Sequence, residues 1–199
     1  MTLMDARSLT SILKNLIFLH DIVVASEELL REASLSCKHT NDQFSRLLYD
    51  YYQNHLIEEV GHLQWLKDDL ASANVDPEFP NRFATTIVGA QYYLIKHVHP
   101  ASLLGYLIVM EGDPISAETL EYLEKIHGNK LFGFLQLHST KDIEHRRELF
   151  EVIDMAPCNL HKVIEESLLI TLQELVCAAR EWRIDPSRDT YPKETSHSE

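Results

Sequence analysis

The sequence predicts an all-α protein, and three observations support that fold class. Apolar residues recur at helical spacing through most of the chain, no segment shows the alternation of a half-buried strand, and only 6 of the 199 residues are glycine. A chain of this length with 45% hydrophobic residues suits one compact domain with a sizeable core. We expect that domain to span residues 1–184 and the polar tail, 185–199, to be disordered.

Capping and helix-breaking residues divide the chain into about seven expected helices. The long first helix ends near Cys37, and Asn41 or Asp42 is placed to cap the second. Pro77 and Pro80 mark the connector after the second helix. The expected helices cover residues 8–36, 42–72, 82–96, 101–112, 116–126, 130–154 and 159–182.

The later boundaries are set by Pro100, Pro114 and Pro157, because proline does not continue a helix. Gly61 lies inside the second expected helix, where glycine costs about 1 kcal/mol relative to alanine, so we expect close packing or a ligand beside it. The segment 101–112 is almost wholly apolar, which predicts a buried, central helix.

The composition disfavours several classes of partner and location. A formal net charge of -13 disfavours nucleic acid and anionic membrane surfaces, which bind clustered Lys and Arg. Cys37, Cys158 and Cys177 lack the spacing of a disulfide framework or a C-x-x-C site, which favours a reducing cytoplasm. We expect neither a signal peptide nor a membrane span in the apolar stretch 13–24, because it is interrupted by Lys14, Asn15, His20 and Asp21.

The chain carries the same spacing of metal-binding residue types twice, as His-x-x-x-acid-x-x-His. The two triplets are His55-Glu59-His62 and His138-Asp142-His145. On a helix, steps of four and then three residues keep three side chains within an arc of about 60°. One such triplet arises by chance in roughly one chain in ten, and two together are much rarer. Each expected helix therefore directs two imidazoles and a carboxylate to one side, which predicts metal binding.

Lone acids complete a pattern typical of carboxylate-bridged di-iron bundles, which take one acid from each of two helices and an acid-x-x-His pair from each of two others. Both triplets contain such a pair. Glu111 supplies one lone acid, and Glu27 or Glu28 the other. Glu111 ends the apolar run 103–110, and a carboxylate buried there needs a cation or a proton. Iron suits the mixed set, because carboxylates bridge hard cations and imidazoles complete each ligand shell.

The alternative is that these acids and histidines line solvent-facing stripes, which we expect for Glu58, Glu144 and Glu148. This alternative is weaker for the triplets, because apolar residues flank both of them. These flanking residues are Leu56, Val60, Leu63, Leu66, Phe134, Leu135, Ile143 and Leu149. His138 is better supported as a ligand than His55. The latter is also suited to orienting a metal ligand through a hydrogen bond, without contacting the metal itself.

Three segments resemble the haem-oxygenase-like di-iron oxidases, also described as iron-containing redox enzymes, which are similar in fold to thiaminase II and pyrroloquinoline-quinone synthase. The segments are HLIEEVGHLQWLKDDL (55–70), ASLLGYLIVMEG (101–112) and LHSTKDIEHRRELF (137–150). The resemblance covers about residues 10–182 and implies a haem-oxygenase-like bundle of about seven helices. Thiaminase-II activity is disfavoured, because no cysteine lies in a segment resembling the catalytic loop of that family.

The resemblance also implies a set of metal ligands, namely His62, Glu111, His138, Asp142 and His145. Several members of the family have a glutamate seven residues before the histidine that corresponds to His62, and this chain has His55 at that position. Glu59 lies three residues before His62. The sixth ligand therefore stays open between Glu59, His55 and an acid of the first helix, Glu27 or Glu28. Iron is expected as one or two Fe²⁺ ions. His20 lies where haem oxygenase has its haem ligand, but a lone histidine on an apolar face is more often a core residue.

The activity implied by the resemblance is that of a non-haem iron oxidase or oxygenase, using O2 on a small organic or amino-acid-like substrate. A ferritin-like iron-handling protein has the same order of acids and histidines, but the extra histidines at 55 and 138 argue against it. A non-enzymatic helical protein that binds a small molecule on this scaffold is a further alternative. We expect a small-molecule substrate and a homodimer, with neither nucleic acid nor membrane as a partner.

Overall fold

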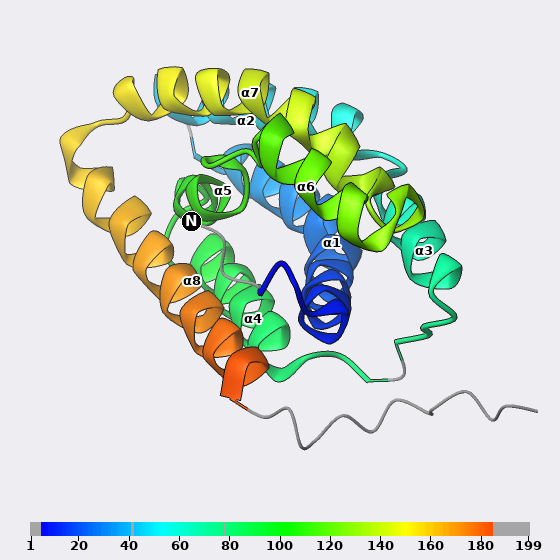
Figure 1. The fold of residues 1–199 in the computed structure, drawn as a ribbon. Coiled ribbons are helices and arrows are strands. Elements are labelled where there is room, and N and C mark those ends of the chain that lie inside the picture. The colour runs from blue at the N-terminus through cyan, green and yellow to red at the C-terminus, as the bar shows by residue number, and fades with distance from the viewer. Residues whose placement is uncertain (1–4, 41, 78, 185–199) are drawn as a thin grey trace, which may run out of the picture.

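The computed structural model describes residues 5–40, 42–77 and 79–184, and these segments form α-helices, one short 3-10 helix and connecting turns (Figure 1). The elements are α1 (Leu9–Cys37), α2 (Gln43–Glu59), α3 (His62–Ser72), α4 (Arg82–His97), α5 (Ser102–Glu111), α6 (Ala117–His127), η1 (Asn129–Leu131), α7 (Gly133–Asp154) and α8 (Cys158–Ile184). The described residues contain no strand, which confirms the all-α fold class. The tail 185–199, expected to be disordered, lies outside the described residues.

Short polar side chains begin several helices, as the sequence indicates. Ser8 caps α1, and Asp42 caps α2 by accepting a hydrogen bond from the backbone N–H of Ser45 at 2.9 Å. Asn81 and Ser116 cap α4 and α6 in the same way. Each cap satisfies a backbone donor that has no partner inside its helix. Asn41, the other candidate for capping α2, lies outside the described residues.

The second expected helix, 42–72, is two helices in the structure. α2 ends at Glu59 and α3 begins at His62. Val60 (φ -58°, ψ 120°) and Gly61 (φ 92°, ψ -5°) have the dihedral angles of the two central residues of a type II turn, whose second position requires positive φ and so favours glycine. The first triplet therefore does not lie on one continuous helical face. With α2 and α3 taken as one broken unit, the elements correspond to the expected helices.

α1 runs through the middle of the bundle and contacts α2, α3, α4, α5 and α8 (Figure 1). α8 packs mainly on α5 and α4, whereas α7 packs on α2, α3 and α5. The larger hydrophobic cluster joins α1, α2, α4, α5 and α8, and a smaller one forms where the start of α1 meets α3, α6 and the start of α7. Leu103 and Leu104 of α5 are fully buried, in agreement with the predicted central helix.

By length and hydropathy alone, α1 is able to cross a membrane. Core helices of globular proteins meet the same criterion, so a single such helix is weak evidence. In this structure Ile12, Leu16 and Phe18 of α1 are fully buried against other helices. The expectation that residues 13–24 do not span a membrane stays a prediction.

α5 approaches α8 closely because of a glycine. A Cβ atom on Gly105 would overlap the backbone carbonyl oxygen of Ile164 and crowd the backbone nitrogen of Leu168. Only a residue without a side chain permits this approach of two backbones. The contact fixes α5 against α8, and so places Glu111, at the C-terminal end of α5, in the middle of the bundle.

The start of α7 is held by a carboxylate from α3. Asp69 is buried, and its two oxygens accept hydrogen bonds from the backbone N–H groups of Gly133 and Phe134, each at 2.9 Å. Phe132, which precedes α7, makes no side-chain capping bond. Burial raises the pKa of Asp69, while the two N–H donors act in the opposite direction. The cap therefore comes from a neighbouring helix and sets the position of α7 relative to α3.

Replacing Asp69 by alanine is expected to lower the free energy of unfolding by about 1–3 kcal/mol, because two N–H groups at a helix start lose their acceptors. Asp69→Asn keeps one acceptor oxygen and should lose less. Asp68→Ala is the matched control, since this neighbouring carboxylate is exposed and bonds only Gln64 among the described hydrogen bonds; we expect a change within about 0.5 kcal/mol. Urea denaturation measures all three variants, and equal losses at the two positions would contradict the capping role.

Candidate metal centre

Six of the predicted ligand residues, all except Asp142 and the acids of the first helix, converge in the middle of the bundle as two groups of three. The His55 cluster consists of His55 from α2, Glu111 from α5 and His145 from α7. The His62 cluster consists of Glu59 from α2, His62 from α3 and His138 from α7. Within each group, one donor atom per residue lies within 4.8 Å of the others, and all six residues are buried. Each cluster therefore combines two imidazoles with one carboxylate.

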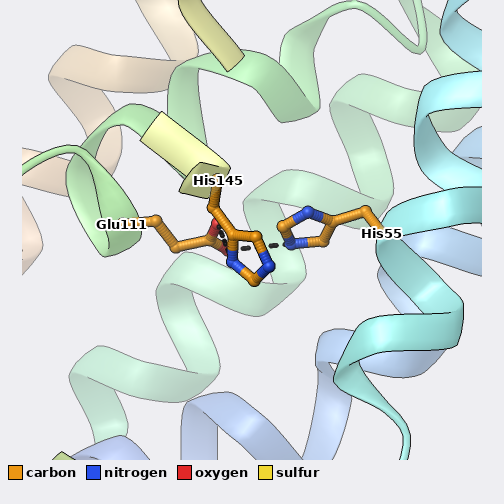
Figure 2. Close-up of side chains that lie close together, drawn as sticks. All are labelled: His55, Glu111 and His145. Atoms are coloured by element: carbon orange, nitrogen blue, oxygen red, sulfur yellow. Dashed lines mark hydrogen bonds and ion pairs between the residues drawn. The ribbon is translucent and has the colours of Figure 1, made fainter. Parts of the chain in front are cut away.

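Figure 2 shows the His55 cluster, in which side chains from three helices point toward one another. His55 Nε2 lies 3.1 Å from Glu111 Oε1, and Glu111 Oε2 lies 3.4 Å from His145 Nδ1. The two imidazole ring centroids are 4.6 Å apart. The carboxylate of Glu111 therefore contacts both rings, with one oxygen toward each.

The His62 cluster is built across the turn that separates α2 from α3. His62 Nδ1 lies 3.0 Å from Glu59 Oε1, and the rings of His62 and His138 meet edge to face with centroids 4.9 Å apart. The positive φ of Gly61 lets the chain turn between Glu59 and His62 while both side chains reach the same point.

Five donor atoms of the two clusters are buried and lack a hydrogen-bond partner. They are Glu59 Oε1, His62 Nδ1, Glu111 Oε2, His138 Nε2 and His145 Nδ1. Elsewhere in the described residues this condition holds only for the hydroxyls of Tyr51 and Ser102. Four of the five face one another, Glu59 Oε1 with His62 Nδ1 at 3.0 Å and Glu111 Oε2 with His145 Nδ1 at 3.4 Å, without forming a hydrogen bond. So many buried polar atoms without a hydrogen bond in one place need a common explanation. A cation in each cluster satisfies all of them, and the residues present therefore fit metal ions.

The donor chemistry of each cluster restricts the class of metal. Two imidazoles with one carboxylate are the donor set of non-haem Fe²⁺ sites that keep coordination positions open. Structural zinc sites instead use four closed ligands and often thiolates. Each cluster offers three donors and no cysteine. The composition thus fits an open site for Fe²⁺ or for catalytic zinc, which also binds two histidines and a glutamate, and does not fit a closed structural zinc site.

Two further carboxylates contact imidazole nitrogens that face away from the clusters. Asp142 Oδ1 lies 2.7 Å from His138 Nδ1, which leaves Nε2 of that ring directed into the His62 cluster. Glu58 Oε2 lies 2.7 Å from His145 Nε2, which leaves Nδ1 directed into the His55 cluster. Carboxylates that accept the second ring N–H fix the orientation and tautomer of metal-binding histidines. Asp142 belongs to neither three-residue cluster, although it is 3.9 Å from His145 Nδ1, so its role as a direct ligand stays a prediction.

Glu58 was expected to face solvent and was not predicted as part of the site. The side chain is 42% exposed, yet its carboxylate contacts a histidine that is 1% exposed. Its position three residues after His55 and four before His62 was the available signal, because those steps place it on the face of the ligands. Of the apolar residues that flank the triplets, Val60 and Ile143 do not shield the site, because they are 63% and 64% exposed.

The first helix supplies neither of the alternative acids to the clusters. Glu28 is exposed and pairs with Arg31 at 3.2 Å, and Glu27 belongs to neither group. Instead both remaining candidates for the sixth ligand belong to the clusters, Glu59 to the His62 cluster and His55 to the His55 cluster.

His20 lies apart from the clusters. Its Nδ1 atom lies 3.2 Å from Asp21 Oδ1, and its side chain lines a separate cavity beside residues 70–77.

A model of the iron-containing redox enzyme family matches residues 34–169, which include every residue of both clusters. The chain belongs to the iron-containing redox enzyme family. That description supports an oxidoreductase. Comparison with curated proteins gave no match.

The haem-oxygenase-like fold is shown by a solved structure that is similar to this chain. It is the crystal structure of a domain of unknown function with a heme oxygenase-like fold from Shewanella denitrificans OS217, with a TM-score of 0.66 and 19% sequence identity. The match covers 96% of this chain and 88% of the other. It confirms the fold that the sequence predicts for this member of the iron-containing redox enzyme family.

In the His55 cluster, the carboxylate of Glu111 and the facing imidazoles each favour the charged form of the other. Burial alone would raise the pKa of Glu111, but the facing imidazoles of His55 and His145 outweigh it and hold that pKa well below its usual range. Burial alone would lower the pKa of His145, but Glu111 and Glu58 raise it to about 9. At neutral pH His145 therefore holds a proton when no metal ion is bound, and metal binding must displace that proton.

Replacing Glu58 by alanine is expected to lower the affinity for Fe²⁺ or Zn²⁺ about 10- to 100-fold, because His145 loses the group that orients it. Glu144→Ala is the matched control on α7, where the carboxylate is 68% exposed and pairs only with Arg147 among the described ion pairs. Competition with a chelating dye measures affinity, and long-range ¹H–¹⁵N spectra report the tautomer of His145. Equal affinities in the two variants, with an unchanged tautomer, would rule out the positioning role.

Stability of the metal-free protein should fall as pH rises from about 6.5 to 9. His145 binds its proton more tightly in the folded state, so its contribution is full below its unfolded pKa of 6.5 and is lost as pH passes about 9. The raised pKa values of His55 and His138 likewise make the stability fall as pH rises. Each histidine contributes a slope of at most about 1.4 kcal/mol per pH unit.

The depressed pKa of Glu111 affects stability at acidic pH. Ionised Glu111 stabilises the folded state above its unfolded pKa, and this stabilisation is lost as pH falls. Urea denaturation in the presence of a chelator measures the profile. His145→Gln should flatten it, whereas His39→Gln, on an exposed residue, should not. Stability that rises between pH 6.5 and 9 would contradict the assignment.

Proposed function

We propose that this chain is a non-haem iron oxidase or oxygenase that holds one ion at each cluster and uses O2 to oxidise a small organic substrate. The observation that carries the proposal is the convergence of two buried groups, each of two imidazoles and one carboxylate, in which five donor atoms form no hydrogen bond. Membership of the iron-containing redox enzyme family supports the choice of iron.

Ferrous iron, when bound, supplies the electron-transfer chemistry with O2 that amino-acid side chains do not perform. The chain contributes binding, orientation and charge. Glu59 and Glu111 each bring a negative charge to one cluster, and three protein donors at each position leave room for exogenous ligands. Glu58 and Asp142 keep His145 and His138 in a fixed orientation. Burial of the clusters excludes bulk water from the reacting groups.

Two other functions remain as outcomes of the same experiment. A ferritin-like protein would accumulate iron far beyond two ions per chain, and the three-donor clusters offer no route to that excess. A non-enzymatic binding protein would hold a small molecule without consuming O2. An amino-acid-like substrate, a homodimer and a cytoplasmic location stay predictions.

Anaerobic reconstitution should yield about two Fe²⁺ per chain in the wild-type protein, as expected for two three-donor sites. His138→Ala and Asp142→Ala should each bind less iron, because one removes a donor of the His62 cluster and the other removes the group that orients it. His39→Ala is the control and should bind as wild type. Metal analysis and an oxygen electrode provide the measurements. A wild-type protein without iron, or variants that bind iron normally, would overturn the proposal.

A further inference from the structure

We infer that the substrate presents a compact, uncharged, largely apolar group, about the size of a six-membered ring, to the His62 cluster. This inference rests on the proposed function for the chemistry that follows binding. The binding itself is argued from a cavity beside the clusters, and it is testable without iron.

The cavity lies between α1, α5 and α7 and has a volume of about 170 Å³. Apolar side chains dominate its wall, among them Ile22 and Val23 of α1, Met110 of α5 and Phe134 and Leu135 of α7. A cavity of about 150 Å³ lined by such residues binds benzene. The volume therefore accommodates one ring or an equivalent branched chain, but not an extended lipid.

The cavity meets the two clusters unequally. Glu59 and His138 of the His62 cluster line it, whereas the His55 cluster contributes only Glu111. His55 and His145 do not form part of the wall. A molecule in this cavity therefore lies against the His62 cluster, and the His55 cluster lies farther from it.

The charges around the cavity select against an anionic group. The carboxylates in its wall come from Glu59, Glu111, Asp113 and Asp142. Among the described residues, no Lys or Arg lines it, and its one basic side chain is His138, which already contacts Asp142 at 2.7 Å. Ser26 and Tyr106 supply hydroxyls, so a neutral polar atom has hydrogen-bonding partners there. A carboxylate on the ligand would meet like charges, unless a metal ion compensates them.

Fluorobenzene and 4-fluorobenzoate are matched probes for this inference, with binding followed by ¹⁹F NMR. In the metal-free protein, fluorobenzene should bind one-to-one with a Kd of about 1 mM or below, the order expected for burying six apolar carbons. The benzoate should bind at least about tenfold more weakly, because burial removes its charge from water and no Lys or Arg of the wall compensates that cost. Absence of fluorobenzene binding, or equal binding of both probes, would overturn the inference.

Val23→Trp fills the cavity and should abolish fluorobenzene binding. Val24→Trp is the matched control, because Val24 is the next residue on α1 and is 54% exposed. Ile115→Trp is a second filling variant, placed in the connector between α5 and α6, where a helix is not disturbed. Circular dichroism checks that each variant is folded. A folded filling variant that binds fluorobenzene as wild type would also overturn the inference.

Metal titration separates this inference from the proposed function. All three tryptophan variants should retain the Zn²⁺ stoichiometry of wild type, since none replaces a cluster residue. Mn²⁺-loaded protein should broaden the ¹⁹F signal of bound fluorobenzene more than Zn²⁺-loaded protein does. Metal binding without fluorobenzene binding refutes the cavity alone, whereas fluorobenzene binding without metal binding refutes the metal centre alone.

Discussion

The structure depends on one constraint, which is that charged and polar donors are buried in the middle of a small helical bundle. Glu59, Glu111 and Asp142 are each less than one-tenth exposed, and they lie among imidazoles that are buried as deeply. Isolation of such groups from water is costly unless opposite charges face them. Without metal, a proton on His145 contributes to meeting this need, in agreement with the raised pKa of that residue. A divalent cation meets it more completely and displaces that proton.

The packing of the helices serves to bring these donors together from distant parts of the sequence. Gly105 lets α5 lie against α8 and so places Glu111. Asp69 fixes the start of α7 on α3, which sets His138 opposite His62. Neither contact includes a residue of the clusters, yet each restricts the position of one ligand-bearing helix. Changes in such residues are able to alter a metal centre that they do not touch.

The surroundings of the two clusters differ, although their donor sets are alike. On one side, α1, α5 and α7 enclose a small apolar cavity that reaches Glu59 and His138. On the other side, the carboxylate of Glu58 connects buried His145 with solvent. Small molecules would therefore reach an ion at the His62 cluster more readily, and water would reach an ion at the His55 cluster more readily. This difference is a physical basis for different roles of the two ions.

The sequence by itself determined the fold class, most helix boundaries and the residue types of the site. These features depend on short-range rules, because apolar periodicity, capping residues and three- and four-residue steps all operate within one helix. Gly61 was a visible anomaly, but its positive φ was not deducible, since a glycine is also compatible with a continuous helix. For the same reason the expected helix 42–72 missed the break.

Only the tertiary structure decided how the donors are divided. The sequence suggested two triplets, each on its own helix, whereas the structure forms each cluster from separate helices and uses α7 in both. It also decided that Glu58 approaches His145 and that Val60 and Ile143 face outward. A periodic pattern gives the direction of a side chain relative to its own helix axis, but its partner depends on which neighbouring helix covers that face and at what height. Those quantities are set by contacts such as Gly105 on α8 and Asp69 on α7, which join residues far apart in the chain.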